Sequence, residues 1–193
     1  MLLAGEDSPA EVRRQISRWL ASGRLIQLRR GLYALAPPHA RALPGALAVA
    51  SRLQRPSYVS LESALAYHGG IPEAVPVVTS VSTGRPRRFK TPLGEFVYRH
   101  LHPSLFWGYR EVELSPGQAA YLAFPEKALL DLFHFTPGPI RRAFVEELRL
   151  APDPLDRGRL EQFAKKTAKP KLIRAASMTI RYLKDEVGKE ATI

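Results

Sequence analysis

The sequence predicts an α+β fold, with a small N-terminal module followed by a larger domain. Three observations support this prediction. A capped amphipathic helix and a short hairpin come first, segments rich in β-branched and aromatic residues occupy the middle, and helical periodicity returns towards the C-terminus. Helices and strands that are segregated along the chain in this way are typical of α+β proteins.

The N-terminal helix is predicted to begin at Ser8. Ser8 and Glu11 have the spacing of a capping box, and Pro9 suits the first helical position. Gly23 is suited to end the helix. The apolar face of the helix consists of Val12, Ile16, Trp19 and Leu20. The opposite face consists of Ala10, Arg13, Arg14, Ser17 and Arg18. The periodicity therefore predicts an amphipathic helix with one basic face.

A β-hairpin is predicted next, with residues 25–28 and 32–35 on either side of a turn at Arg29, Arg30 and Gly31. A helix followed by a basic hairpin corresponds to the second half of a winged helix-turn-helix. In that module the helix enters the major groove and the arginines of the hairpin pair with phosphates. Only seven residues precede Ser8, so we expect the module at 1–37 to be partial. An ordinary amphipathic helix with a hairpin is the alternative.

Residues 36–41 include two prolines and predict a connection to a second domain at 45–193. Ser60 and Ser63 are candidate caps within that domain. The expected strands are 75–81, 94–101 and 109–114. The expected helices are 45–54, 61–68, 125–133 and, approximately, 139–149, 154–166 and 170–187.

The composition limits the class of protein. The chain has 193 residues and 45% of them are hydrophobic, which is enough for a sizeable core. It contains no cysteine, which excludes disulfides and thiolate chemistry. It has no apolar run of about eighteen residues, and its first residues do not have the pattern of a signal peptide. We therefore expect a cytoplasmic protein.

The positive charge is large and clustered. Lys and Arg number 29 against 18 Asp and Glu, which gives a formal net charge of +11. Most of the excess lies in residues 13–30, 85–110 and 157–184. Clustered positive charge points to a polyanionic partner, most often nucleic acid, although a solvated basic surface is the alternative.

Two further groups of basic residues are candidate nucleic-acid contacts. Residues 83–89 are predicted as a loop that contains Arg85, Arg87 and Arg88, and such a loop with a flanking aromatic could bind phosphate and stack a base. For Phe89 we favour a return to the core. In the C-terminal helices the candidate contacts, all expected on the outer surface, are Lys165, Lys166, Lys169 and Lys171.

No catalytic, metal or cofactor motif stands out. The sequence lacks HExxH, the phosphate-binding GxxxxGK[ST] loop and a GxSxG elbow. His100 and His102 share one side of a predicted strand, but isolated histidines are more often packing or surface residues. Lys127 and Asp131 are four residues apart on a helix and are expected to form a surface pair. We therefore expect no metal, no cofactor and no enzymatic activity.

Several segments resemble the AbiEi-type antitoxins of type IV toxin–antitoxin systems. The similar segments are Leu28–Tyr33, Tyr58–Gly70, Val78–Phe89 and Pro125–Asp131. The resemblance implies a two-domain repressor. Its N-terminal winged helix would bind inverted repeats in its own promoter, and its C-terminal domain would oppose a nucleotidyltransferase-like toxin. The short N-terminus departs from the family pattern.

The sequence therefore predicts a transcriptional autorepressor and antitoxin that binds double-stranded DNA. The residues expected to contact DNA are Arg13, Arg14, Ser17, Arg18, Arg29 and Arg30. The alternative is a protein- or RNA-binding module without sequence-specific DNA binding.

Overall fold

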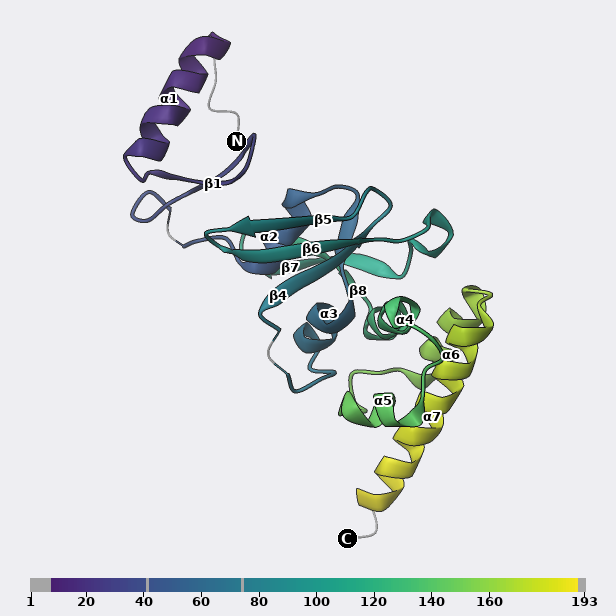
Figure 1. Cartoon of the computed structure of the whole chain (residues 1–193). Helices are drawn as coiled ribbons and strands as arrows, with labels where there is room; N and C mark the ends of the chain where they lie inside the picture. The colour runs from purple at the N-terminus through teal and green to yellow at the C-terminus, as the bar shows by residue number, and fades with distance from the viewer. Residues whose placement is uncertain (1–7, 41, 74, 191–193) are drawn as a thin grey trace.

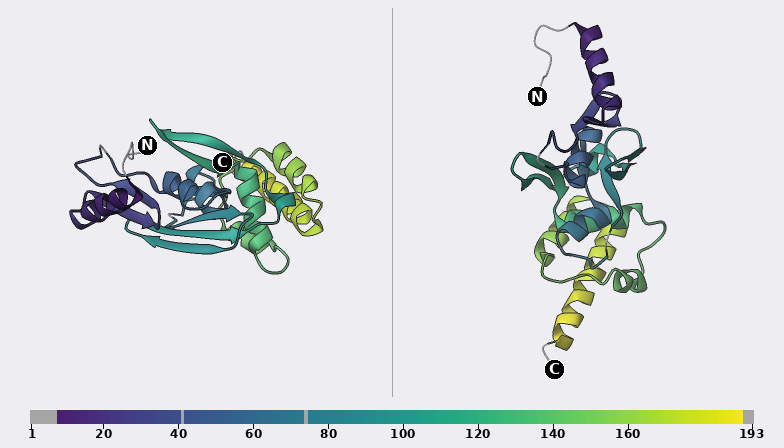
Figure 2. Two further views of the ribbon diagram at one scale, coloured as in Figure 1. Left: turned by 90° about the horizontal axis from the view of Figure 1, so that it is seen from above. Right: turned by 90° about the vertical axis from the view of Figure 1, so that its left-hand side faces the viewer.

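The computed structural model describes residues 8–40, 42–73 and 75–190, with side chains up to residue 185. Within this part the chain contains helices and two sheets, which confirms the α+β class. The molecule is elongated. The first helix lies at one end, the large sheet lies in the middle, and the C-terminal helices form the other end (Figures 1 and 2).

The N-terminal elements are α1 (Pro9–Ala21), β1 (Leu25–Arg29) and β2 (Leu32–Leu35). The predicted capping box is present, because the Ser8 hydroxyl accepts from the Glu11 amide at 3.3 Å and Glu11 accepts from the Ser8 amide at 2.9 Å. Gly31 has a φ of +77°, which the tight turn of the hairpin requires and which glycine adopts without strain. Local sequence therefore sets the start of the helix and the turn of the hairpin.

The hairpin packs against the large sheet. Leu28 and Ala34 are buried and belong to the same apolar cluster as the helices and strands of the larger domain. Beyond the hairpin, residues 36–40 form turns, as the two prolines led us to expect. Helix α2 (Ala46–Leu53) then begins at the N-cap Gly45. The N-terminal hairpin and the second domain thus share one core.

The large sheet has six strands in the order β5-β6-β4-β3-β8-β7. Its strands are β3 (Ser57–Val59), β4 (Val77–Ser82), β5 (Arg87–Thr91), β6 (Gly94–His100), β7 (Tyr109–Ser115) and β8 (Gln118–Ala123). Parallel pairing of β3 with β8 and of β4 with β6 joins the antiparallel pairs. The sequence did not predict β3, β5 or β8 as strands, because their pairing partners are distant or their sequence is highly charged.

Helices cover the two faces of this sheet unequally. Helix α2 lies on one face, where the Tyr98 hydroxyl donates to the Ala50 carbonyl. Helices α3 (Leu61–Tyr67) and α4 (Pro125–Phe135) lie on the other face, where Tyr58 of β3 meets Asp131 of α4. The core fills both interfaces, and every residue of α4 from position 125 to 133 is buried.

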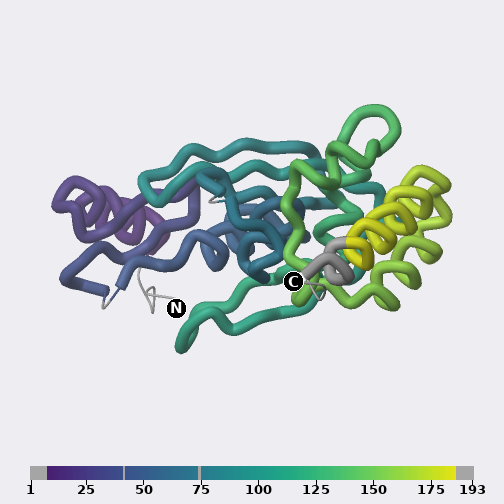
Figure 3. The backbone as a smooth tube through the Cα atoms, turned by 90° about the horizontal axis from the view of Figure 1, so that it is seen from below, coloured from purple at the N-terminus to yellow at the C-terminus, as the bar shows by residue number. Residues whose placement is uncertain are grey.

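The C-terminal region is helical, as predicted, with α5 (Arg142–Glu147), α6 (Arg157–Lys166) and α7 (Pro170–Glu190). A short 3-10 helix, η1 (Pro103–Leu105), precedes β7. The backbone tube shows α6 and α7 packed side by side at the end of the molecule remote from α1 (Figure 3). Among the described helices, none combines the length and apolar character needed to cross a membrane.

Candidate nucleic-acid interface

The basic face of α1 is open to solvent. Arg13, Arg14, Ser17 and Arg18 are all exposed, and no residue of α1 is buried. The Arg13 Nε donates to the Pro9 carbonyl at 3.0 Å and the Ser17 hydroxyl donates to the Arg13 carbonyl at 3.0 Å, so both contacts stay within the helix. Within the described ranges these arginines form no ion pair. Their guanidinium groups are therefore available to an external anion.

The apolar face of α1 is only half covered. Val12, Ile16, Trp19 and Leu20 are partly buried, and they are the least exposed side chains of the helix. This confirms the predicted polarity of α1 and shows that the helix is attached mainly through β1. The described residues contain one helix and one hairpin in this region. They do not form a complete winged helix-turn-helix, and residues 1–7 of the predicted module lie outside the described part.

The hairpin carries Arg29 and Arg30 at its exposed tip. The Arg29 guanidinium donates to the Arg30 carbonyl at 3.1 Å, and neither residue pairs with an acid among the described residues. Burial raises the pKa of the Tyr98 phenol in β6, and the charge of Arg29 opposes that rise. Strand β1, which ends at Arg29, contacts the edge strand β5 of the large sheet.

The basic segment at 83–89 is not a loop throughout, and this corrects the prediction. Arg85 lies in the irregular segment between β4 and β5, but Arg87 and Arg88 belong to the edge strand β5. Pairing with β6 accounts for the difference, because it places Arg87 opposite Tyr98 and Arg88 opposite Val97. The two arginines therefore start from opposite faces of the sheet.

Phe89 returns to the core as predicted. It is half-buried and its ring meets that of Tyr98 edge-on, with the ring centroids 5.7 Å apart. Arg88 forms an ion pair with Glu95 on β6. The Arg88 side chain lowers the pKa of Glu95 through this hydrogen bond. Part of the positive charge at this edge is thus compensated.

The C-terminal lysines lie at the end of the molecule opposite α1 (Figure 1). Lys165 pairs with Glu161 at 2.7 Å, and the Lys166 ammonium lies 4.4 Å from the centre of the Trp107 ring. Lys169 is half-buried. Lys171 does not point outward as predicted, since it is half-buried and donates to the Thr136 carbonyl. These four residues do not share a surface with α1.

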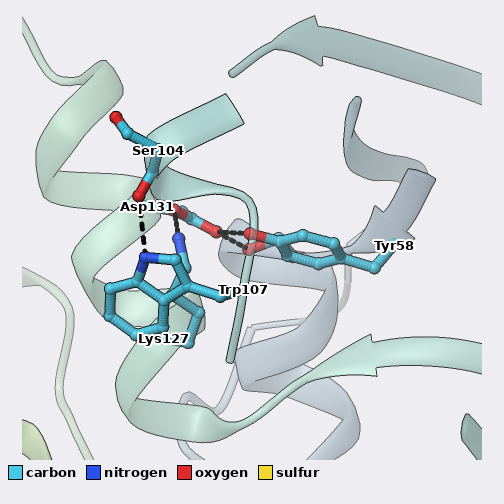
Figure 4. A network of polar contacts seen from close by, with 6 residues as sticks. Tyr58, Ser104, Trp107, Lys127 and Asp131 are labelled. Atoms are coloured by element: carbon cyan, nitrogen blue, oxygen red, sulfur yellow. Dashed lines mark hydrogen bonds and ion pairs between the residues drawn. The ribbon is translucent and has the colours of Figure 1, made fainter. Parts of the chain in front are cut away.

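Lys127 and Asp131 form a buried pair rather than the predicted surface pair (Figure 4). Their side chains are only 2% and 1% exposed. The Tyr58 hydroxyl and the Ser60 hydroxyl donate to the same Asp131 oxygen at 3.0 and 2.7 Å. Burial raises the pKa of Asp131, and the neighbouring Lys127 opposes this rise. A spacing of four residues on a helix is compatible with a surface pair and with a buried pair. The packing around α4 decides that the Lys127–Asp131 pair is buried.

The surroundings of this pair suit a structural role. Trp107 lies against Lys127, with the ammonium 5.2 Å from the ring centre, and the indole donates to the Ser104 carbonyl at 3.0 Å (Figure 4). Gly108 has a φ of +76°, and a Cβ at that position would meet the Lys127 side chain at 2.9 Å. Ser60 stands at the N-cap of α3 but donates to Asp131 instead of capping the helix. The network therefore joins β3 to α4.

The described residues contain no group of three or more His, Asp or Glu side chains that could hold a metal ion. The ring of His100 is bonded to the Gly84 carbonyl at 3.0 Å, whereas that of His102 is bonded to Ser104 at 2.8 Å. Glu62 on α3 is half-buried. The two histidines thus have separate local partners and do not converge on one site.

Comparison with models of known protein families gives no match to this chain, and no curated protein is significantly similar to it. The resemblance to AbiEi-type antitoxins therefore stands on the four segments quoted above.

Proposed function

We propose that this protein is a DNA-binding transcriptional regulator of the AbiEi antitoxin type, which binds duplex DNA through α1 and the β1–β2 hairpin. The observation that carries the proposal is the open basic face of α1 beside an arginine-tipped hairpin at one end of the molecule. The α1 helix offers Arg13, Arg14, Ser17 and Arg18 to a major groove, which is about 12 Å wide and admits one helix.

The hairpin supplies the second set of contacts. Arg29 and Arg30 lie at its tip, where they would reach the phosphates that flank the groove. Each phosphate neutralised contributes about −0.9 to the slope of log affinity against log salt. With about five arginines engaged, we expect a slope of about −4.5. Binding should therefore weaken steeply as the salt concentration rises.

The antitoxin role rests on the resemblance. It implies that the protein binds inverted repeats in its own promoter and that it opposes a nucleotidyltransferase-like toxin. The larger domain would carry the second activity, since it contains three of the four similar segments. A nucleotidyltransferase-like gene beside the coding sequence would support this assignment.

Binding to the upstream DNA of the gene tests the proposal. Fluorescence anisotropy would compare a labelled upstream duplex with a scrambled duplex of the same length. We expect an Arg14→Ala/Arg18→Ala variant to lose at least tenfold in affinity, because two phosphate or base contacts are removed. The matched control is Arg174→Ala/Arg181→Ala on α7, which removes the same charge from exposed sites at the opposite end. Equal affinity for the two duplexes, or an equal loss of affinity in both variants, would contradict the proposal.

One observation favours the alternative function. Helix α1 buries none of its residues, so its half-covered apolar face is available to a protein partner. In that case the α+β domain would bind a protein or an RNA, and α1 would pack against that partner through its apolar face instead of reading DNA. Co-purification with the product of the neighbouring gene, or tight binding to tRNA without binding to duplex DNA, would decide for this alternative.

A further inference from the structure

Among the described residues, no helix covers one part of the large sheet. Helix α3 packs on β4, and α4 packs on β8, on the same face of the sheet. Beyond them, β5 and β6 form an open groove of about 610 Å³ that ends at Phe135, the last residue of α4. The groove thus lies between the edge of the sheet and the end of a helix that is distant in sequence.

The groove has an apolar floor and cationic walls. Val97 lies opposite Arg88 in the β5–β6 pair, and Arg99 follows Val97 by two residues, so the three side chains share one face. The Arg99 guanidinium lies over the Phe135 ring, 5.2 Å from its centre. The Phe135 ring holds the Arg99 guanidinium in one position. Less conformational entropy is therefore lost when a ligand binds to this guanidinium.

The charges around the groove are only partly compensated. Glu95 pairs with Arg88, but Arg99 has no ion pair among the residues that the structure describes. The hairpin strand β1, which ends at Arg29, contacts the edge strand β5. An anionic ligand is therefore favoured over a neutral one.

We propose that this groove binds an unpaired nucleotide of a single-stranded nucleic acid, with the base stacked on the Arg99–Phe135 pair and the phosphate held by Arg88. In a duplex the bases are paired and the backbone offers phosphate and sugar, which would leave the apolar floor and the aromatic support without a partner. Unpaired bases stack readily on aromatic rings and on guanidinium planes. The site is separate from the α1 surface and does not depend on duplex binding.

Anisotropy with labelled single strands tests this site in the full-length protein. The probes are oligomers of about ten nucleotides of dT and of rU, and an abasic phosphodiester strand of the same length. At about 100 mM salt we expect Arg99→Gln and Phe135→Leu each to weaken binding of the dT oligomer five- to tenfold. The abasic strand should bind more weakly than dT and should not respond to Phe135→Leu. A preference for rU over dT would assign the site to RNA, and the reverse would assign it to DNA.

Two further variants keep the test independent of folding and of the proposed function. Glu95→Gln frees Arg88 from its ion pair and should tighten single-strand binding two- to threefold, a gain that unfolding cannot produce. Phe135→Leu should weaken dT binding by the same factor in the Arg14→Ala/Arg18→Ala background as in the wild type, and Arg174→Gln is the control for the loss of one exposed charge. The proposal is overturned if Arg99→Gln and Phe135→Leu bind dT as the wild type does, or if the abasic strand binds as tightly as dT.

Discussion

Two helices of this protein carry charged side chains spaced four residues apart, and their surroundings are opposite. On α1, Arg14 and Arg18 are exposed on a helix that buries none of its residues. On α4, Lys127 and Asp131 are almost completely buried and are bonded to each other. The helical spacing is the same, so the difference comes from what packs around each helix.

This difference separates two uses of charge. A buried charge is costly unless it is paired and hydrogen-bonded, and Asp131 meets this condition through Lys127, Tyr58 and Ser60. An exposed arginine has no such requirement and contributes little to stability. The α4 pair therefore belongs to the scaffold, whereas the α1 arginines are free to serve recognition.

The largest expected effect comes from breaking the buried pair. Lys127→Met leaves Asp131 buried without its counter-ion and should lower the free energy of unfolding by about 3–5 kcal/mol. Urea denaturation followed by circular dichroism would measure the change. The matched control is Lys165→Met, which breaks the exposed pair with Glu161 and should change stability by less than about 1 kcal/mol. Similar losses of unfolding free energy in both variants would contradict the claim that the buried pair contributes more to stability than the exposed one.

A smaller effect is expected when one leucine from each helix is truncated. Leu129 of α4 is fully buried, and Leu129→Ala should cost about 2–5 kcal/mol of unfolding free energy through the cavity that it leaves. Leu20 of α1 is half-buried, and Leu20→Ala should cost less than about 1 kcal/mol because solvent already reaches it. The same denaturation experiment measures both. If Leu20→Ala cost as much as Leu129→Ala, the attachment of α1 would be tighter than its exposure indicates.

The smallest effect concerns the pH dependence of α1. Hydrogen bonds from Ser8 lower the pKa of Glu11 below its ordinary value of 4.5 in the folded state. A lowered carboxyl pKa stabilises the folded form above the unfolded pKa, and this contribution is lost as the pH falls through the folded pKa. We therefore expect the first turn of α1 to fray on acidification below pH 4.5. Amide exchange at residues 11 and 12 would report this fraying.

The control for this prediction is Glu11→Gln. The amide can still accept from the Ser8 backbone but does not titrate, so the first turn should lose its pH dependence. Identical acid profiles for the wild type and Glu11→Gln would show that the capping carboxylate is not responsible.

The sequence predicted the elements whose causes are local. Ser8, Pro9 and Glu11 set the start of α1, and Gly31 sets the turn of the hairpin. The strands around 77–82, 94–100 and 109–115 could also be predicted from their composition. It missed β5, because Arg87, Arg88 and Lys90 suggest a solvated loop until β6 is available as a pairing partner.

For the candidate interface, the sequence identified the arginines of α1 and of the hairpin, and their exposure follows from the amphipathic pattern. The groove at the sheet edge could not be predicted in the same way. Arg99 and Phe135 are far apart in the chain. Only the packing of α4 against the sheet brings the Arg99 guanidinium to 5.2 Å from the centre of the Phe135 ring.

By itself the sequence determined the fold class, the capped basic helix and the uneven distribution of positive charge, because these depend on neighbouring residues. The tertiary structure decided which charges are buried, which basic residues lie on one surface and where the sheet remains uncovered. The physical reason is that burial and proximity depend on contacts between distant segments. The spacing of Lys127 and Asp131 is compatible with a solvent-exposed pair and with a buried pair. The packing of α4 against β3 selects the buried one.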